Sequence, residues 1–372
     1  MMPIAILLLV GAVQAGFLAF VLAFNKNKDL ASKWLIAWLL FITIHLLFVH
    51  FGFSGVYKEY PLLLIFGSAL MLLQGPFLFL YTAILTNRIK SLNVWQLLHA
   101  VPYLFYTCYI AVVLMEVDAP NRYEHISGII DDPQNLMMLS LGLLNHLHIM
   151  VYLVLSILLL KKHSKSLTDT FSYLEDINLK WLKNLLIGIT VVAVVILFGL
   201  LTSDLFPFIS HYAKATLIYS ALAILPFYMS FYAIRQKLIF PLHADLLNVK
   251  YEASRLTKKE SAKIAEQLVH HMQSNKPYLN PKLSIKDLSD DLGLHPKDLS
   301  RVINENFEKN FFNFINEYRV DEFISKIKDP KHDRFTLIAI AYDCGFNTKS
   351  SFNSIFKKTK GMTPSAFKAR LT

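Results

Sequence analysis

The chain has 372 residues, of which 54% are hydrophobic and only 17% are charged, and its mean hydropathy is +0.42. This composition excludes an intrinsically disordered protein, and it is too apolar for an ordinary soluble one. The formal net charge of +10 favours an anionic partner such as DNA or the cytoplasmic lipid face. The two cysteines, Cys108 and Cys344, form no CxxC pattern, so neither a disulfide framework nor a cysteine-based zinc site is supported.

The apolar residues are concentrated before Pro241. Seven apolar stretches precede it, each of roughly 20 residues and therefore long enough to cross a bilayer. They run over 4–24, 34–56, 61–86, 97–115, 137–160, 184–204 and 215–235. We therefore predict an all-α protein in which a multi-pass, seven-helix membrane bundle over residues 1–237 is followed by a soluble helical tail.

The basic residues of the loops predict the orientation, because cytoplasmic loops are enriched in Lys and Arg. The loops after the first, third and fifth spans carry ten of them: Lys26, Lys28, Lys33, Arg88, Lys90, Lys161, Lys162, Lys165, Lys180 and Lys183. The other three loops carry only Lys58, Arg122 and Lys214. We expect the N-terminus outside and residues 241–372 in the cytoplasm, with the bundle in the inner (plasma) membrane of a bacterium.

Polar side chains inside the spans include His45, His50, His146 and His148. Such histidines can bind a metal or a ligand, but hydrogen bonding between helices is the commoner reason for polar groups inside a bundle. We favour the structural role and predict no metal and no cofactor. P-loop, GxSxG and HExxH motifs are absent, so we predict that the chain is not an enzyme.

Residues 242–273 are predicted to form a helix that leads out of the membrane. Its apolar residues follow the steps of four and three that are typical of a coiled-coil seam: Leu242, Leu246, Val249, Ala253 and Leu256. The seam is short, and it fits either a dimer zipper or a face packed on the chain's own domain. We predict a linker and signalling helix over 238–263, and a homodimer that forms through residues 242–256.

A helix–turn–helix plan follows. Ser284 and Asp287 form a near capping box, Gly293 supplies a left-handed turn, and a second helix starts at Pro296. That second helix presents four polar residues outward: Lys297, Ser300, Arg301 and Asn304.

The same plan is repeated after a longer helix over 310–328. Thr336 caps a short helix, residues 345–347 turn the chain, and another helix spans 348–358. The outward candidates there are Lys349, Ser350, Asn353, Lys357 and Lys358. From Cys344 to the end the chain carries basic residues and no acidic one, which fits either phosphate contact or a solvated face.

The second half of the tail carries fixed residues at fixed spacing: Ile340-Ala341-x-x-x-Gly345-Phe346-x-x-x-Ser350-x-Phe352-x-x-x-Phe356-Lys357-x-x-x-Gly361-x-Thr363-Pro364. In this pattern residues 264–372 resemble the DNA-binding domain of the AraC/XylS transcription regulators. The resemblance implies two helix–turn–helix units joined by one long helix, with both second helices in successive major grooves of double-stranded DNA. Many relatives have Arg where this chain has Ser354, so any contact made by that Arg is missing here.

The membrane part is similar in architecture to the seven-span region that is fused to such domains in some bacteria. Together these features predict a membrane-anchored, one-component DNA-binding regulator whose bundle senses an unknown small molecule or a state of the lipid bilayer. The alternative is a transporter-like protein whose tail is only a regulatory or protein-binding module. The spans disfavour it, because they lack charged residues away from their ends.

The orientation can be tested with a reporter that is active only in the periplasm. Fused after Thr372, it should be inactive, because the loop charges place the C-terminus in the cytoplasm. The same reporter inserted between the fourth and fifth spans should be active. Activity of the C-terminal fusion would show that the number of spans is wrong by one.

Overall fold

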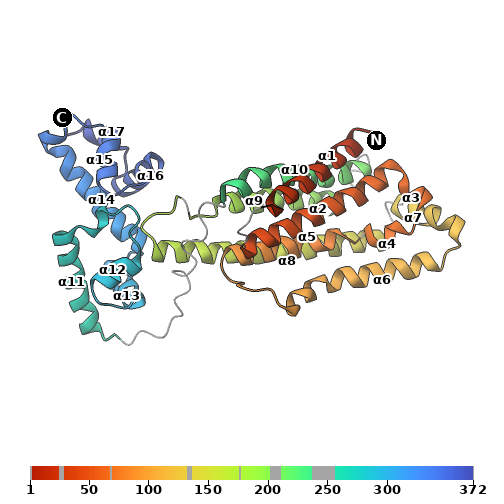
Figure 1. The fold of residues 1–372 in the computed structure, drawn as a ribbon, viewed down its shortest axis with the longest axis horizontal. Coiled ribbons are helices and arrows are strands. Elements are labelled where there is room, and N and C mark those ends of the chain that lie inside the picture. Colours follow the sequence, from red (N-terminus) through yellow and green to blue (C-terminus); the bar gives the residue numbers. More distant parts are fainter. Residues whose placement is uncertain are drawn as a thin grey trace. The chain divides into compact units, whose positions relative to one another are not determined.

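The computed structural model describes residues 2–24, 29–67, 69–131, 136–175, 177–201, 211–236 and 256–371. Over these ranges the chain is helical, with one isolated antiparallel bridge and no strand. It divides into two compact units (Figure 1). The membrane unit is Met1–Lys161 with Lys180–Lys237, and the soluble unit is Lys162–Leu179 with Leu238–Thr372.

The membrane unit is built from α1 (Met2–Ala23), α2 (Leu30–Ser54), α3 (Val56–Glu59), α4 (Leu63–Gly67), α5 (Met71–Leu85), η1 (Val94–Ala100), α6 (Val101–Met115), η2 (Ala119–Asn121), α7 (Arg122–Asp131), α8 (Leu136–Thr170), α9 (Lys180–Leu201) and α10 (His211–Gln236). Six segments among the described residues are long and apolar enough to cross a membrane, which confirms six of the predicted spans. The seventh prediction falls on α10, whose described apolar stretch, Ile218–Tyr232, is shorter.

Close helix packing holds the membrane unit together. Helix α1 packs along α2 and α10, and a Cβ at Gly11 would lie 2.9 Å from the backbone of Ala223. A small residue at this crossing lets the two backbones approach, as is common between membrane helices. The outer surface is apolar, with Val13, Phe17 and Phe105 each more than 60% exposed. Such a surface suits lipid rather than water.

Two of the membrane histidines connect helices. Trp38 Nε1 donates to Gln74 Oε1 at 3.2 Å, and Gln74 Nε2 lies 3.0 Å from His45 Nδ1. His50 Nδ1 lies 3.0 Å from the carbonyl oxygen of Ala5. These contacts are those expected of structural histidines. Among the residues that the structure describes, no three His, Cys, Asp or Glu side chains are grouped as metal ligands.

Helix α8 differs from its prediction. The fifth span was expected to end near residue 160, but α8 continues without a break to Thr170. The added turns carry Leu167, which is 3% exposed and packs with Phe171, Tyr173 and Ile177. Burial of this small cluster accounts for a helix that extends past the apolar stretch. Consequently, α8 runs from the membrane unit into the soluble unit.

The soluble unit contains α11 (Lys258–Asn275), η5 (Pro277–Leu279), α12 (Ile285–Asp291), α13 (Pro296–Phe307), α14 (Phe311–Lys328), η6 (Pro330–His332), α15 (Leu337–Asp343), α16 (Lys349–Lys360) and α17 (Pro364–Lys368). The predicted caps are present. The Ser284 and Asp287 side chains form a capping box at α12, and Thr336 accepts from the Ala339 amide at α15. The pairs α12/α13 and α15/α16 therefore share one plan, each with a glycine at positive φ in its turn.

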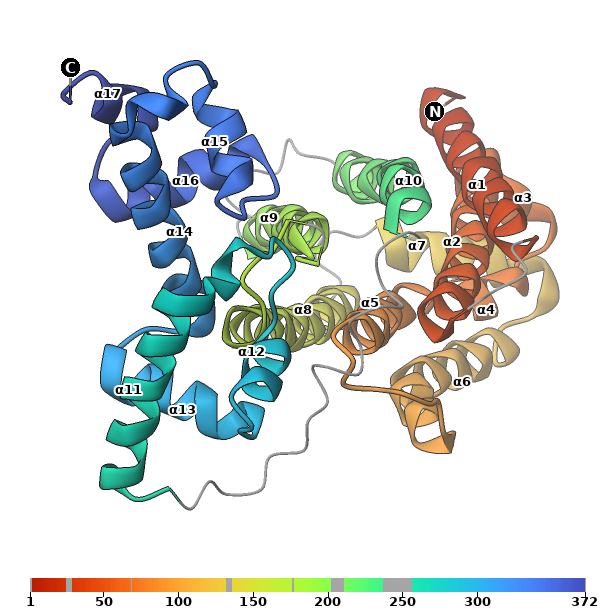
Figure 2. The ribbon, with the colours of Figure 1, turned by 60° about the vertical axis from the view of Figure 1, so that its left-hand side comes forward.

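Helix α14 runs past both helix pairs (Figure 2). It belongs to two hydrophobic cores. Its first half places Phe314 and Ile315 in a core with α11, α12 and α13. Its second half places Val320 and Phe323 in a core with α15 and α16. The two helix pairs are thus mounted on one continuous helix. We call the middle of α14, where the two cores adjoin, the joint.

The predicted helix over 242–273 needs correction. Residues 242–255, with four of the five seam positions, lie outside the described residues. Leu256 is described and is not helical, because the helix starts only at Lys258. Thr257 is its N-cap, with ψ of 159°, and Thr257 and Glu260 form a capping box. The seam therefore does not continue as one helix into α11, whose apolar side (Ile264, Leu268 and Met272) is buried in the soluble unit.

Two glycines with positive φ give a matched test of the joint. A Cβ at Gly345 (φ +90°) would overlap the carbonyl oxygen of Tyr278, whereas at Gly293 (φ +66°) nothing lies within 4 Å. Gly293→Ala should cost roughly 1–2 kcal/mol from backbone strain alone. Gly345→Ala should cost about 1–3 kcal/mol more, because tightly packed backbone must move. Hydrogen exchange of the α12–α16 peptides in the full-length chain would measure both. Equal losses of protection would refute the close packing at Gly345.

Candidate nucleic-acid interface

The second pair presents a polar face at the start of α16. Thr348 caps this helix by accepting from the Ser351 amide, and Phe352 and Phe356 anchor it in the core. The opposite side carries Lys349 and Ser350, both exposed, and Asn353 one turn later, which is half-buried. Residues three and four apart on a helix are neighbours, so these three side chains lie on one face. The structure brings together the residues that the sequence predicted as base-contacting.

The basic residues of this region fall into two sets. Lys360 pairs with Asp321 at 2.9 Å, Lys368 lies 3.8 Å from Asp333, and Lys358 Nζ donates to Asn313 Oδ1 at 3.5 Å. These contacts use part of the positive charge within the unit. Lys349 and Lys357 are exposed and have no recorded ion pair in the described residues, so their charges face solvent. Of the two residues predicted to contact phosphate, only Lys358 has a side-chain hydrogen-bond partner within the described part of the unit.

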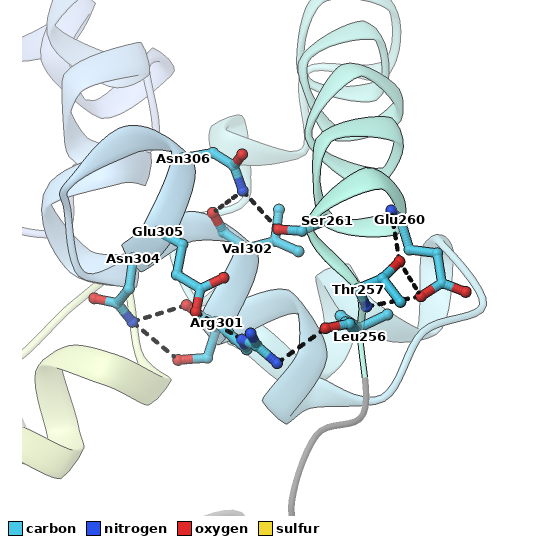
Figure 3. Close-up of polar contacts among 10 residues, drawn as sticks. Leu256, Thr257, Glu260, Ser261, Arg301, Val302, Asn304, Glu305 and Asn306 are labelled. Carbon is cyan, nitrogen blue, oxygen red and sulfur yellow. Dashed lines mark hydrogen bonds and ion pairs between the residues drawn. The ribbon is translucent and has the colours of Figure 1, made fainter.

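The face of α13 is already engaged with its surroundings (Figure 3). Arg301 Nε donates to Glu305 Oε1 at 2.7 Å, and its Nη1 donates to the carbonyl oxygen of Leu256 at 3.3 Å. Asn304 Nδ2 donates to the backbone and side-chain oxygens of Ser300 at 2.8 and 3.4 Å. Lys297 is half-buried. At α13 the predicted residues share a face, but donors of Arg301 and Asn304 already have acceptors within the unit.

The chain that enters the soluble unit is tied to this face. Besides the bond from Arg301 to Leu256, Asn306 Nδ2 donates to Ser261 Oγ at 2.8 Å and so connects α13 to α11 (Figure 3). The Glu305 partner of Arg301 is visible in the sequence as an i,i+4 pair. The Leu256 carbonyl is not, because a backbone acceptor 45 residues away has no sequence signal.

Sequence reasoning also missed Arg319, the largest buried polar side chain of the soluble unit. It lies at the joint and is 1% exposed. Its Nε donates to the carbonyl oxygen of Tyr278 at 2.8 Å, and Nη2 to that of Asn280 at 2.8 Å. Burial lowers the pKa of Arg319 to about 10, an effect that the nearby Glu175 opposes, so the guanidinium remains charged at neutral pH.

Comparison with known proteins identifies this region. Residues 288–370 match the model of a helix-turn-helix domain family, and the match runs from α12 to α17, across both pairs. The C-terminal region carries an AraC-type helix-turn-helix domain. No curated protein and no solved structure matches the chain. The AraC-type domain supports DNA binding and transcription regulation, while the apolar helices before it support a membrane protein.

The face of α16 predicts a separation between base and phosphate contacts. Asn353→Ala should relax the preference at one base position, since a bidentate Asn–adenine pair is worth roughly 1–3 kcal/mol of discrimination. Lys357→Ala should instead weaken binding to all sequences alike and reduce the salt slope by about one unit. Binding selections on the full-length chain in nanodiscs, at several salt concentrations, would measure both effects.

Two exposed residues of the soluble unit serve as controls for these variants. Thr359 lies further along α16, and Lys331 is an exposed charged residue of η6. Replacing either with Ala should leave DNA binding unchanged. If Asn353→Ala selected the same sequences as the parent, α16 would not be the reader. Specificity would then rest with Lys297, Ser300 and Arg301 of α13.

Proposed function

We propose that this protein is a membrane-anchored, one-component transcription regulator that binds specific double-stranded DNA through both helix pairs of its AraC-type domain. The observation that carries the proposal is the mounting of both pairs on α14, with matching caps and turns. In helix–turn–helix proteins the second helix enters the major groove with its N-terminal residues toward the bases. Helices α13 and α16 are the second helices here.

The two second helices take different roles in this proposal. Helix α16 reads bases through Lys349, Ser350 and Asn353, while Lys357 contacts phosphate and Lys358 assists it. Helix α13 contributes Lys297, Ser300, Arg301 and Asn304. On binding, the bond from Arg301 to the Leu256 carbonyl is exchanged for a contact to DNA. The α12/α13 pair therefore contacts DNA only when the chain at Leu256 releases Arg301.

The membrane unit anchors the regulator in the inner membrane and senses a small molecule or a state of the bilayer, with the AraC-type domain in the cytoplasm. Anchoring obliges the target DNA to approach the membrane. Two chains pair through residues 242–256, which raises the effective concentration of the second domain at a repeated site. The chain acts by binding and not by catalysis. The transporter-like alternative predicts no sequence-specific DNA binding at all.

Sequencing the genomic DNA that co-purifies with the full-length chain tests the proposal. A sequence-specific regulator enriches a small set of sites with a shared motif, and a variant with Lys349→Ala and Asn353→Ala together loses that enrichment. A dimer enriches two copies of the motif at fixed spacing, whereas a monomer enriches one. Recovery of random genomic fragments by both proteins would favour the transporter-like alternative.

A further inference from the structure

Residues 171–173, which directly follow α8, are packed into the soluble unit. We call them the docked segment. Phe171, Ser172 and Tyr173 are each at most 6% exposed. Phe171 forms an antiparallel bridge with Ser284, the N-cap of α12. The Ser172 amide and hydroxyl both donate to the carbonyl oxygen of Leu283, at 3.2 and 2.7 Å.

The docked segment completes the hydrogen bonding of Arg319. A guanidinium has five N–H donors, and Arg319 makes five contacts. Nη1 donates to the Ser172 carbonyl at 3.0 Å, and Nη2 donates to the Ser172 hydroxyl at 2.9 Å. Asn316 Nδ2 also donates to the Ser172 carbonyl, at 3.0 Å. The remaining acceptors are the carbonyl oxygens of Tyr278 and Asn280 and the side-chain oxygen of Asn316.

Departure of the docked segment would therefore leave two N–H donors of a buried cation without partners, and the Asn316 amide would keep only its bond to the Phe312 carbonyl. Unpaired buried charges are among the most costly defects in a protein interior. The joint would have to rearrange or admit water. Docking of residues 171–173 and the geometry of the joint are thus energetically coupled.

The joint also controls how the two pairs are mounted. On one side, Arg319 holds the Tyr278 and Asn280 carbonyls, which precede α12. On the other, its Nε lies 3.0 Å from the position of a Cβ on Gly345, in the turn between α15 and α16. The hydrogen-bond partners of Ser172 are Asn316 and Arg319 at the joint and Leu283 just before α12, and none of them lies on α13 or α16. Docking thus fixes the joint without engaging the candidate DNA-contacting residues of α13 and α16.

We infer that the docked segment regulates DNA binding. When residues 171–173 are docked, the joint holds α13 and α16 in the arrangement that binds DNA. Helix α8 ends at Thr170 and connects the docked segment covalently to the membrane unit. The state of the bundle therefore sets how often the segment is docked. This inference rests on the proposed function, since it concerns the regulation of the same DNA-binding site. Docking of residues 171–173 should strengthen DNA binding, and DNA binding should in turn favour docking.

Thiol labelling measures docking in the full-length chain. Ser172→Cys is placed in a Cys108→Ser background, because Cys108 is the exposed native cysteine. Cys344 is retained, since burial raises the pKa of its thiol to about 12 and leaves it unreactive. The protein in nanodiscs is treated with a maleimide, alone, with a duplex from the enriched genomic sites, and with a scrambled duplex. Ser164→Cys, exposed on α8, is the matched control.

The specific duplex should slow labelling at position 172 about fivefold or more, the range of ordinary allosteric coupling, and leave position 164 unchanged. Phe171→Asp places a charge at a buried position and so undocks the segment. By reciprocity, it should weaken the affinity for that duplex by up to the same factor. Faster labelling with the duplex would make the segment an inhibitor, and an unchanged rate would make it a purely structural contact; either result overturns the inference alone. Absence of any DNA binding by the parent protein overturns the proposed function and this inference with it.

Discussion

The soluble unit depends on one buried cation. Arg319 is enclosed at the joint, and all of its donors are directed at carbonyl, amide or hydroxyl oxygens, with no carboxylate among the acceptors. Several neutral dipoles must therefore be held in place to compensate one charge, and they come from three stretches of chain: residues 171–173, residues 278–280 and α14 itself. This requirement explains why Tyr278, Asn280 and Ser172 converge on the middle of α14, where the Gly345 turn is packed closely beside Arg319.

The two helix pairs have the same arrangement, but they differ in how accessible their outward polar residues are. On α16 Lys349, Ser350 and Lys357 are exposed to solvent. On α13, by contrast, Arg301 is bonded to Glu305 and to the Leu256 carbonyl, and Asn304 is bonded to Ser300. In the proposed function, this asymmetry gives DNA recognition two steps, first through α16 and then through α13. Exchange of the bond from Arg301 to the Leu256 carbonyl for a DNA contact would make the chain at Leu256 part of the recognition.

Local chemistry made much of this fold predictable. The caps at Ser284 and Thr336 and the glycines of the two turns act within a few residues, so their pattern is visible in the sequence. The outward face of α16 followed from the commitment of Phe352 and Phe356 to the core. The nine candidate contact residues lie on α13 and α16, although their DNA contacts remain predictions.

The contacts that escaped prediction connect distant parts of the chain through the backbone. Ser172 and Arg319 are 147 residues apart, and a carbonyl acceptor leaves no trace in residue type or periodicity. The extension of α8 past residue 160 was missed because its last turns are polar in sequence and gain their burial only from the docked cluster. The start of α11 was missed because the apolar spacing outweighed the capping box formed by Thr257 and Glu260.

The length of α8 has a mechanical consequence. Its 35 residues make a rod about 52 Å long, whereas the hydrocarbon core of a bilayer is about 30 Å thick. An unbroken helix resists twisting, because every residue is tied to the next turn by a backbone hydrogen bond. In the proposed regulation, a rotation of α8 within the bundle would reach Phe171 through one continuous helix. A rotation by one residue, about 100°, would move Ser172 away from its hydrogen bonds with Arg319. Torque on this single helix would then be enough to undock residues 171–173.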